Sequence, residues 1–307
     1  MDRIQRERKE YRSLPRGYYH LDTDGWSGGE LFHTIEQYVQ GMAGIALLAI
    51  KFGVAIYAFE LMPNHIHILL SGTGAQCLEC FYFLIRRINK RLRADGYPPL
   101  PEDYWLKLTP INNRESMRQH VIYLARNKYE KNECTPFGHM WGTGYLIYNQ
   151  IVDLIEGRPV SSFLKKDIEQ LTGSLTPLPP HWLINPVVGV LPSNYVDIPK
   201  LKELFPSVRH YLAMMVKDYE AIVRVSNQLG EAVEWSEDEA RDILSKVCSS
   251  MFPGKSLFTL SADEKSKLAV RADSTYQLPA TLMAPVLGLS VHVLGQVLRS
   301  KEYGIRK

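Results

Sequence analysis

Two short apolar runs separated by a four-residue break constrain the fold more than any other feature of the chain. Residues 54–61 and 66–70 are rich in Ile, Leu and other apolar residues, as buried β-strands are. The break contains Pro63 and Asn64, and both residue types favour turns. The sequence therefore predicts a tight β-hairpin.

Strand and helix patterns alternate on both sides of this hairpin. The other strand patterns cover residues 17–24 and 104–111, and the helical patterns cover residues 30–52, 76–94 and 114–129. The order β-α-β-β-α-β with a final helix is that of a ferredoxin-like α+β fold, an antiparallel sheet with helices on one face. In this arrangement the second strand of the hairpin is central.

The second half of the chain has a different character. Five prolines lie between residues 172 and 198, which suits a linker or a segment that wraps around a core. Helical patterns return after residue 198. We therefore expect a first domain over residues 1–150, a Pro-rich connection over 151–197 and a mainly helical C-terminal region over 198–307.

Composition and charge narrow the class of protein. The charged N-terminus has no apolar core of a secretory signal, and no apolar run reaches the roughly 18 residues of a membrane span. The four cysteines do not suggest a disulfide scaffold, so we expect a cytoplasmic protein, and Cys77 and Cys80 are interpreted as small apolar helix residues. Residues 84–131 hold 11 Lys/Arg against 5 Asp/Glu, an excess that favours an anionic partner.

Two histidines accompany the second strand of the hairpin. Side chains alternate along a strand, so His65 and His67 point to one face, about 7 Å apart, and Ile66 and Ile68 to the other. Two imidazoles on one face can ligate one metal ion. They can equally be two half-buried histidines at the end of a strand.

The helix predicted at residues 114–129 carries further polar groups. Tyr123 and Asn127 are four residues apart and share a helical face, with His120 one turn earlier. If this face packs on the histidine-bearing strand, the Asn127 carbonyl oxygen could complete a metal site beside Tyr123. From residue types alone, Tyr123 can also be an ordinary core or interface tyrosine.

Basic side chains gather on two of the predicted helices. One face of helix 76–94 and the tyrosine helix together present Arg86, Arg87, Lys90, Arg91, Arg93, Arg126 and Lys128. Such a cluster suits contact with phosphate groups. A solvated helix face is the alternative interpretation.

The stretch "ATLMAPVLGLSVHVLGQVLRS" near the C-terminus resembles a helix-turn-helix, which would lie within about residues 263–300. Ser290 would cap its second helix, and Ser290, His292 and Gln296 would face the major groove. Pro285 departs from the pattern, because proline inside a helix removes a hydrogen bond. A purely structural pair of helices is the other interpretation.

Two segments resemble a known family. "ELMPNHIHILLSG" resembles the His-hydrophobic-His (HUH) signature of the tyrosine transposases that act on single-stranded DNA, and it is close to their Met-Pro-Asn-His-x-His consensus. "VIYLARN" resembles the helix in which their catalytic tyrosine is followed four residues on by a polar metal ligand, typically asparagine in the REP-associated branch. The resemblance covers residues 17–149. Lys128 departs from it, because the family commonly has Asn-Pro there.

The resemblance implies a metal-dependent transposase or endonuclease that cleaves and rejoins single-stranded DNA at hairpin-forming sites. Tyr123 would form a 5′-phosphotyrosine intermediate, with Tyr129 as the reserve nucleophile. His65, His67 and Asn127 would hold Mg²⁺ or Mn²⁺. Such a protein would act at the nucleoid, away from membranes, as a monomer or homodimer.

Two alternatives accompany this interpretation. The chain can be a sequence- or hairpin-specific DNA-binding protein that derives from such a transposase and no longer cuts, an alternative favoured by the departure at Lys128. It can also be a metallohydrolase of a small substrate, which needs an acidic base near the histidines. Glu60 is the nearest acid in sequence, and it would point to the other face if the strand were continuous.

Overall fold

The structure is a computed structural model in which two compact units, Met1–Val208 and Arg209–Lys307, are each described by themselves. The described residues are 3–23, 29–101, 104–130, 139–144, 156–205, 207–216, 219–220, 222–223, 227, 233 and 235–304. For residues 3–5, 127–130 and 300–304 the description covers the backbone alone.

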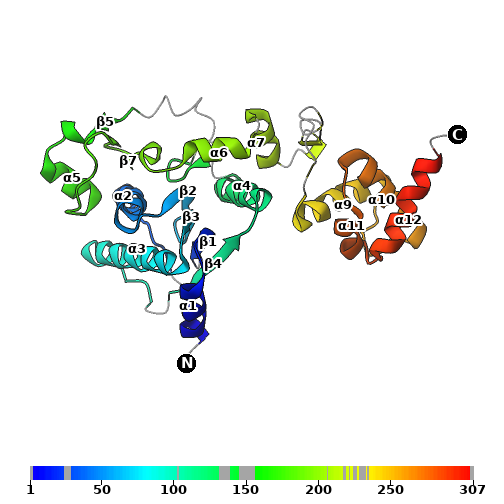
Figure 1. Ribbon diagram of the computed structural model, residues 1–307, viewed down its shortest axis with the longest axis horizontal. Coiled ribbons are helices and arrows are strands. Elements are labelled where there is room, and N and C mark those ends of the chain that lie inside the picture. The colour runs from blue at the N-terminus through cyan, green and yellow to red at the C-terminus, as the bar shows by residue number, and fades with distance from the viewer. Residues whose placement is uncertain are drawn as a thin grey trace. The chain divides into compact units, whose positions relative to one another are not determined.

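A four-stranded antiparallel sheet forms the centre of the first unit (Figure 1). The strands β1 (Gly17–Thr23), β2 (Ala55–Leu61), β3 (Ile66–Gly72) and β4 (Leu106–Ile111) lie in the order β2-β3-β1-β4. The amide of Met62 donates to the carbonyl of His65 at 2.9 Å and closes the β2–β3 hairpin. The predicted α+β class, the hairpin and the central place of the histidine strand are confirmed.

Helices cover both faces of this sheet. The helices α2 (Ile35–Phe52) and α3 (Gly74–Ala94) pack together on the face to which Leu61 and Ile66 point. Helix α4 (Arg114–Glu130) packs against β2 and β3 on the opposite face (Figure 1). On this face the ring of Tyr123 lies against that of His67. The two helices of the ferredoxin-like order thus share one face, as predicted, and the terminal helix α4 covers the other. Because both faces are covered, β3 is almost wholly buried.

Local signals fix where the two long helices begin and end. Thr73 and Gln76 form a reciprocal capping box at the start of α3, and Thr34 caps α2 by accepting from the amide of Gln37. Gly53 ends α2 in the left-handed region with φ of 60°. The N-terminal helix α1 (Arg3–Ser13) leads to a close approach at Gly74, where a Cβ would lie only 1.8 Å from the Tyr11 carbonyl oxygen.

The outer edge of β2 is covered by two segments that are distant in sequence. The amide of Leu61 donates to the carbonyl of Trp141 at 2.9 Å, and Glu60 and Gly142 form an antiparallel bridge. At the other end of β2, Val196 forms a parallel bridge with Ile56. The pairing groups of this edge strand are therefore engaged within the unit.

The Pro-rich segment packs against α2 as part of the first unit. It contains the small antiparallel sheet of β5 (Arg158–Pro159), β6 (Leu183–Asn185) and β7 (Gly189–Val190), and the helices α5 (Lys165–Thr172) and α6 (Ile198–Leu204). Helix α2 contacts both α5 and β7. This segment therefore wraps around the core of the unit.

The second unit is mainly helical, as predicted. After α7 (Val208–Met215) come α9 (Glu237–Met251), α10 (Ala262–Tyr276), α11 (Ala280–Leu287) and α12 (Val291–Gly304), which pack around Ile243, Leu268 and Leu294. Gly288, with φ of 64°, makes the turn between α11 and α12, and Ser290 Oγ accepts from the amide of Val293. In the described part of the chain, no helix is long and apolar enough to cross a bilayer.

Candidate active site

A row of polar side chains crosses the sheet on the face covered by α4. The strand registers place Glu60, His67, Asp22 and Lys107 side by side on β2, β3, β1 and β4. The expectation that Glu60 points to the other face is therefore wrong. The chain reverses between β2 and β3, so the pairing of Glu60 with His67 decides its face.

His67 lies at the centre of this row and is buried, with 2% of its surface exposed. Its Nδ1 is 3.0 Å from Asp22 Oδ1 and 3.1 Å from His20 Nε2. Because a neutral imidazole has one N–H, donation from Nδ1 to Asp22 leaves the lone pair on Nε2. This Nε2 atom is buried and has no hydrogen-bond partner among the described residues.

Burial and hydrogen bonding set the charges of the groups around His67. Burial alone would raise the pKa of the Asp22 carboxyl, but the hydrogen bond from His67 and the electrostatic effect of the neighbouring imidazoles outweigh burial and lower the pKa. Burial, together with the neighbouring imidazoles of His67 and His120, lowers the pKa of His20 to about 3. A carboxylate and a neutral imidazole thus flank His67.

The His65 ring lies beside that of His67, as strand alternation predicts. The ring centroids are 4.7 Å apart and the planes are nearly perpendicular. Asn64 Oδ1 is 2.8 Å from Nδ1 of His65, which places the lone pair of this ring on Nε2 as well. Metal-bound histidines in proteins usually have such a partner on the second ring nitrogen, so the two rings fit a metal site.

Helix α4 places Tyr123 over the histidines. Its ring centroid is 5.4 Å from that of His67 and 6.1 Å from that of His20, and 51% of the residue is exposed. One turn earlier, His120 contacts the His20 ring at 5.1 Å, with its Nδ1 2.7 Å from the Ser116 carbonyl oxygen. This helix face therefore packs on the histidine strand, which the sequence had left as a condition.

Three predicted residues of α4 fall outside what the structure describes. The backbone of Asn127 lies in α4 one turn after Tyr123, but its side chain and those of Lys128 and Tyr129 lie outside the described residues. Within the described part of the chain, no three His, Cys, Asp or Glu side chains converge as metal ligands. Two imidazoles completed by an asparagine amide are a different ligand set.

Glu60 is held at one end of the row by the segment that covers β2. Its Oε1 is 3.3 Å from Nε2 of His139, whose ring also approaches the carbonyl of Leu61 at 3.1 Å. A Cβ at position 142 would lie 1.9 Å from Oε2 of Glu60. Glycine at 142 therefore lets the covering segment approach the carboxylate.

Sequence reasoning missed His20, Asp22 and His139 as members of this cluster. The first two could have been found, because they lie two residues apart on a predicted strand and so share a face. The approach of His139 depends on a contact across about 80 residues, for which the sequence has no local signal.

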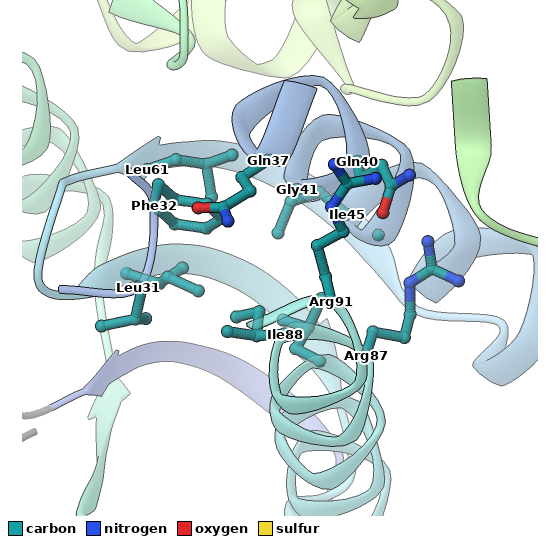
Figure 2. Close-up of a pocket in the computed structure, with 13 residues that line it drawn as sticks. Leu31, Phe32, Gln37, Gln40, Gly41, Ile45, Leu61, Arg87, Ile88 and Arg91 are labelled. Carbon is teal, nitrogen blue, oxygen red and sulfur yellow. The ribbon is translucent and has the colours of Figure 1, made fainter. Parts of the chain in front are cut away.

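The predicted basic residues are divided between the two faces of the sheet. Helix α3 lies on the face opposite the histidines, and two of its arginines make contacts within the protein. Arg87 donates to the carbonyls of Thr172 and Gly173, and Arg91 Nε lies 2.6 Å from Asp95 Oδ2. Figure 2 shows both arginines at a small apolar cleft between α2 and α3.

The other predicted basic residues have different surroundings. Arg86, Lys90 and Arg93 are exposed on α3, and Arg126 is half-buried on α4, three residues after Tyr123. Burial lowers the pKa of Arg87. In the second unit His292 and Gln296 are exposed on α12, with 3.0 Å between their Nε2 atoms.

Comparison with known proteins gives partial matches. No protein-family model matches the chain. The ISDra2 transposase TnpA of Deinococcus radiodurans is 33% identical over 58 residues, which are 19% of this chain and 41% of that protein. The chain therefore matches about two fifths of the length of this curated relative.

A solved structure of a REP-associated tyrosine transposase bound to a REP hairpin is also similar to this chain. The alignment has 14% sequence identity and a TM-score of 0.33, and it covers 55% of this chain and 94% of that one.

Proposed function

We propose that this protein is a tyrosine transposase or endonuclease that cuts and rejoins single-stranded DNA at hairpin-forming sites. The observation that carries the proposal is the packing of Tyr123 on the buried His67 ring, beside which the half-buried His65 ring lies. A half-exposed tyrosine beside the imidazoles of His67 and His20 suits attack on a phosphate that approaches from solvent. The local identity with a transposase supports the same reaction class.

In this proposal His65, His67 and Asn127 hold a divalent cation, Mg²⁺ or Mn²⁺, which when bound would stabilise the charge that develops on the scissile phosphate. The unpartnered Nε2 of His67 is the observation in favour of the site. Imidazole ligands alone also suit zinc and other transition metals. The preference for Mg²⁺ or Mn²⁺ comes from the family resemblance.

The residues of this chain have separate tasks in the reaction. Asp22 holds the His67 ring in one tautomer and orientation, and Asn64 does the same for His65. The Tyr123 hydroxyl gives up its proton as its oxygen forms a bond to phosphorus and the bond to the 3′ oxygen breaks. The departing 3′ oxygen takes up one proton to become a hydroxyl, so no proton is gained or lost overall. The phosphotyrosine conserves the phosphodiester energy, so a second 3′ hydroxyl can reverse the step.

The reaction is tested with a hairpin oligonucleotide from the DNA that flanks the gene, incubated with Mg²⁺ or Mn²⁺ and resolved on a denaturing gel. The wild-type protein is expected to form a covalent DNA adduct that requires the metal and is absent in Tyr123→Phe. Tyr97→Phe is the matched control, because Tyr97 stacks on His33 and not on a histidine of the cluster, and its variant should retain the adduct. An adduct that persists in Tyr123→Phe excludes Tyr123 as the nucleophile.

The alternative is a hairpin-binding protein that does not cut. It has the same described geometry, and it differs in the outcome of this assay. Tight binding of the hairpin without an adduct at any metal concentration would establish it. The departure from the family pattern at Lys128 is the sequence feature that favours it.

The second unit is proposed to bind double-stranded DNA through α12. The α11–α12 pair has the short turn of a helix-turn-helix, and Val291, His292, Val293 and Gln296 are exposed on α12. Residues 243–307 hold nine Lys/Arg against four Asp/Glu. The double variant of His292 and Gln296 to Ala should weaken duplex binding roughly tenfold or more, and Phe258→Ala, an exposed residue outside α12, should not.

A further inference from the structure

A second pocket opens on the same face of the sheet as the histidine cluster. It lies between β1, β4, the start of α4 and α6, and its volume is about 550 Å³. Its lining consists of apolar, amide and charged residues: Tyr18, Ile111, Asn112, Asn113, Arg114, Met117, Lys200, Glu203 and Leu204. Pockets of this size, with an apolar floor and a few polar groups, are typical of small-ligand sites.

The floor of the pocket is apolar and includes an available aromatic ring. Ile111, Met117 and Leu204 are buried, and Tyr18 is 40% exposed. The Tyr18 ring is braced by an edge-to-face contact with Tyr57 at 5.4 Å. A braced and exposed tyrosine ring offers a surface on which a planar group can stack.

The rim of the pocket carries more positive than negative charge. Arg114 donates to the Glu203 backbone carbonyl at 2.5 Å, and Lys200 Nζ lies 3.5 Å from the Glu203 carboxylate. The rim thus has two cationic side chains, Arg114 and Lys200, and one carboxylate, that of Glu203. Asn113 caps α4 through its Oδ1, and Asn112 is an exposed amide. The rim can therefore receive one anionic group and hydrogen-bond a polar edge.

The pocket is aligned with the proposed reaction centre. Tyr18 precedes Asp22 by four residues on β1 and points to the same face, so the two are about 13 Å apart along the strand. Met117 precedes Tyr123 by six residues on α4, about 9 Å along the helix. A short extended strand of DNA that reaches Tyr123 can therefore continue into the pocket.

We infer that this pocket binds an unpaired nucleotide of the DNA substrate close to the cleaved bond. The base stacks on Tyr18, the Asn112 amide bonds to the edge of the base, and Lys200 faces the phosphate. The inference rests on the proposed function and deepens it. One wall comes from α6, which lies outside residues 17–149 that resemble the transposase family, so the subsite depends on the longer chain.

The test measures binding in the Tyr123→Phe background, so that no strand is cut. The probe is a fluorescent hairpin from the DNA that flanks the gene, prepared with and without short unpaired extensions. Tyr18→Ala should weaken binding of the extended hairpin by roughly 5- to 150-fold, the range for one base–aromatic stack. It should leave binding of the blunt hairpin unchanged, and Tyr18→Phe should retain most of the affinity.

Two further variants sharpen the result. Lys200→Gln should reduce the slope of log affinity against log salt concentration by about one, the value for one phosphate contact. This change should occur for the extended hairpin and not for the blunt one. Tyr97→Ala is the control for loss of a tyrosine elsewhere in the unit and should bind both probes as the parent does. Equal binding of the extended hairpin by Tyr18→Ala and its parent, or no binding of either probe, would overturn the inference.

The outcome separates this inference from the proposed function. If the wild-type chain forms the covalent adduct but Tyr18→Ala has no effect on binding, the cleavage proposal stands and the pocket proposal fails. If Tyr18→Ala selectively weakens binding of the extended hairpin but no adduct forms, the pocket binds a nucleotide in a protein that does not cut.

Discussion

The hydrogen bond between Asp22 and His67 should control the affinity of the site for a divalent metal. The Oδ1–Nδ1 distance is 3.0 Å, and Asp22 is about three quarters buried, with 24% of its side chain exposed. A hydrogen bond to a charged group contributes about 1.5–3 kcal/mol. This corresponds to roughly 10- to 150-fold in an equilibrium constant, which agrees with the 10- to 100-fold typical for removal of a partner of a metal-bound histidine.

The two substitutions at this position should differ in size. Asp22→Asn keeps an oxygen acceptor for His67 and loses the charge, so Mn²⁺ affinity should fall by about tenfold. Asp22→Ala loses the acceptor as well and should approach a 100-fold loss. Binding of Mn²⁺ to the protein is measured without DNA, by calorimetry or from the electron paramagnetic resonance signal of free Mn²⁺. This measurement reports the affinity for the metal independently of cleavage.

A matched pair elsewhere in the unit supplies the control. Glu30 lies 2.9 Å from His33, so Glu30→Gln also removes a carboxylate from a histidine, but from one that is not a proposed metal ligand. It should leave Mn²⁺ affinity unchanged. Unchanged affinity in both Asp22 variants, with binding lost in His67→Ala, would refute the role of Asp22. Absence of Mn²⁺ binding by the wild-type chain would refute the metal site itself.

Two further predictions concern stability. Since the pKa of His20 falls from 6.5 to about 3 on folding, the unfolded chain binds more protons between these pH values, and stability should rise as pH increases from 3 to 6.5. His20→Gln should therefore remove about 2 kcal/mol of the stability loss between pH 6.5 and pH 5, measured by urea unfolding with a chelator present. An unchanged loss of stability in this variant would contradict the argument. Gly142→Ala should lower the free energy of unfolding by about 1–3 kcal/mol, because its Cβ would lie 1.9 Å from the Glu60 carboxylate. Gly17→Ala, whose nearest contact would be 3.4 Å, should change unfolding little, and equal effects of the two would contradict the argument.

Local sequence signals were sufficient for the four strands of the central sheet and for α2, α3 and α4. Pro63 and Asn64 between two apolar runs predicted the hairpin, and the four-residue spacing of Tyr123 and Asn127 predicted a shared helical face. These features depend on neighbours within one turn or strand, where the periods of 2 and 3.6 residues apply.

The errors arose where pairing or packing joins distant segments. The face of Glu60 depends on the reversal of the chain and on the register with β3, which alternation along one strand does not show. The placement of α4 on the opposite face brings His20 and His120 together. From its helix face alone, Arg87 was predicted to contact phosphate. In the structure it donates to the Thr172 carbonyl, which lies 85 residues away in sequence.

The covered edge of β2 has a consequence for how the catalytic part can be separated from the rest of the chain. The resemblance to the transposase family ends near residue 149, so an experimenter would naturally truncate the chain close to that residue. Such a shortened protein would lose Val196 and Asp197, whose amide donates to the Ile56 carbonyl. One end of an apolar edge strand would then be open to pairing with other chains, a recognised route to aggregation. The motif-bearing fragment should therefore be soluble only when it extends through α6.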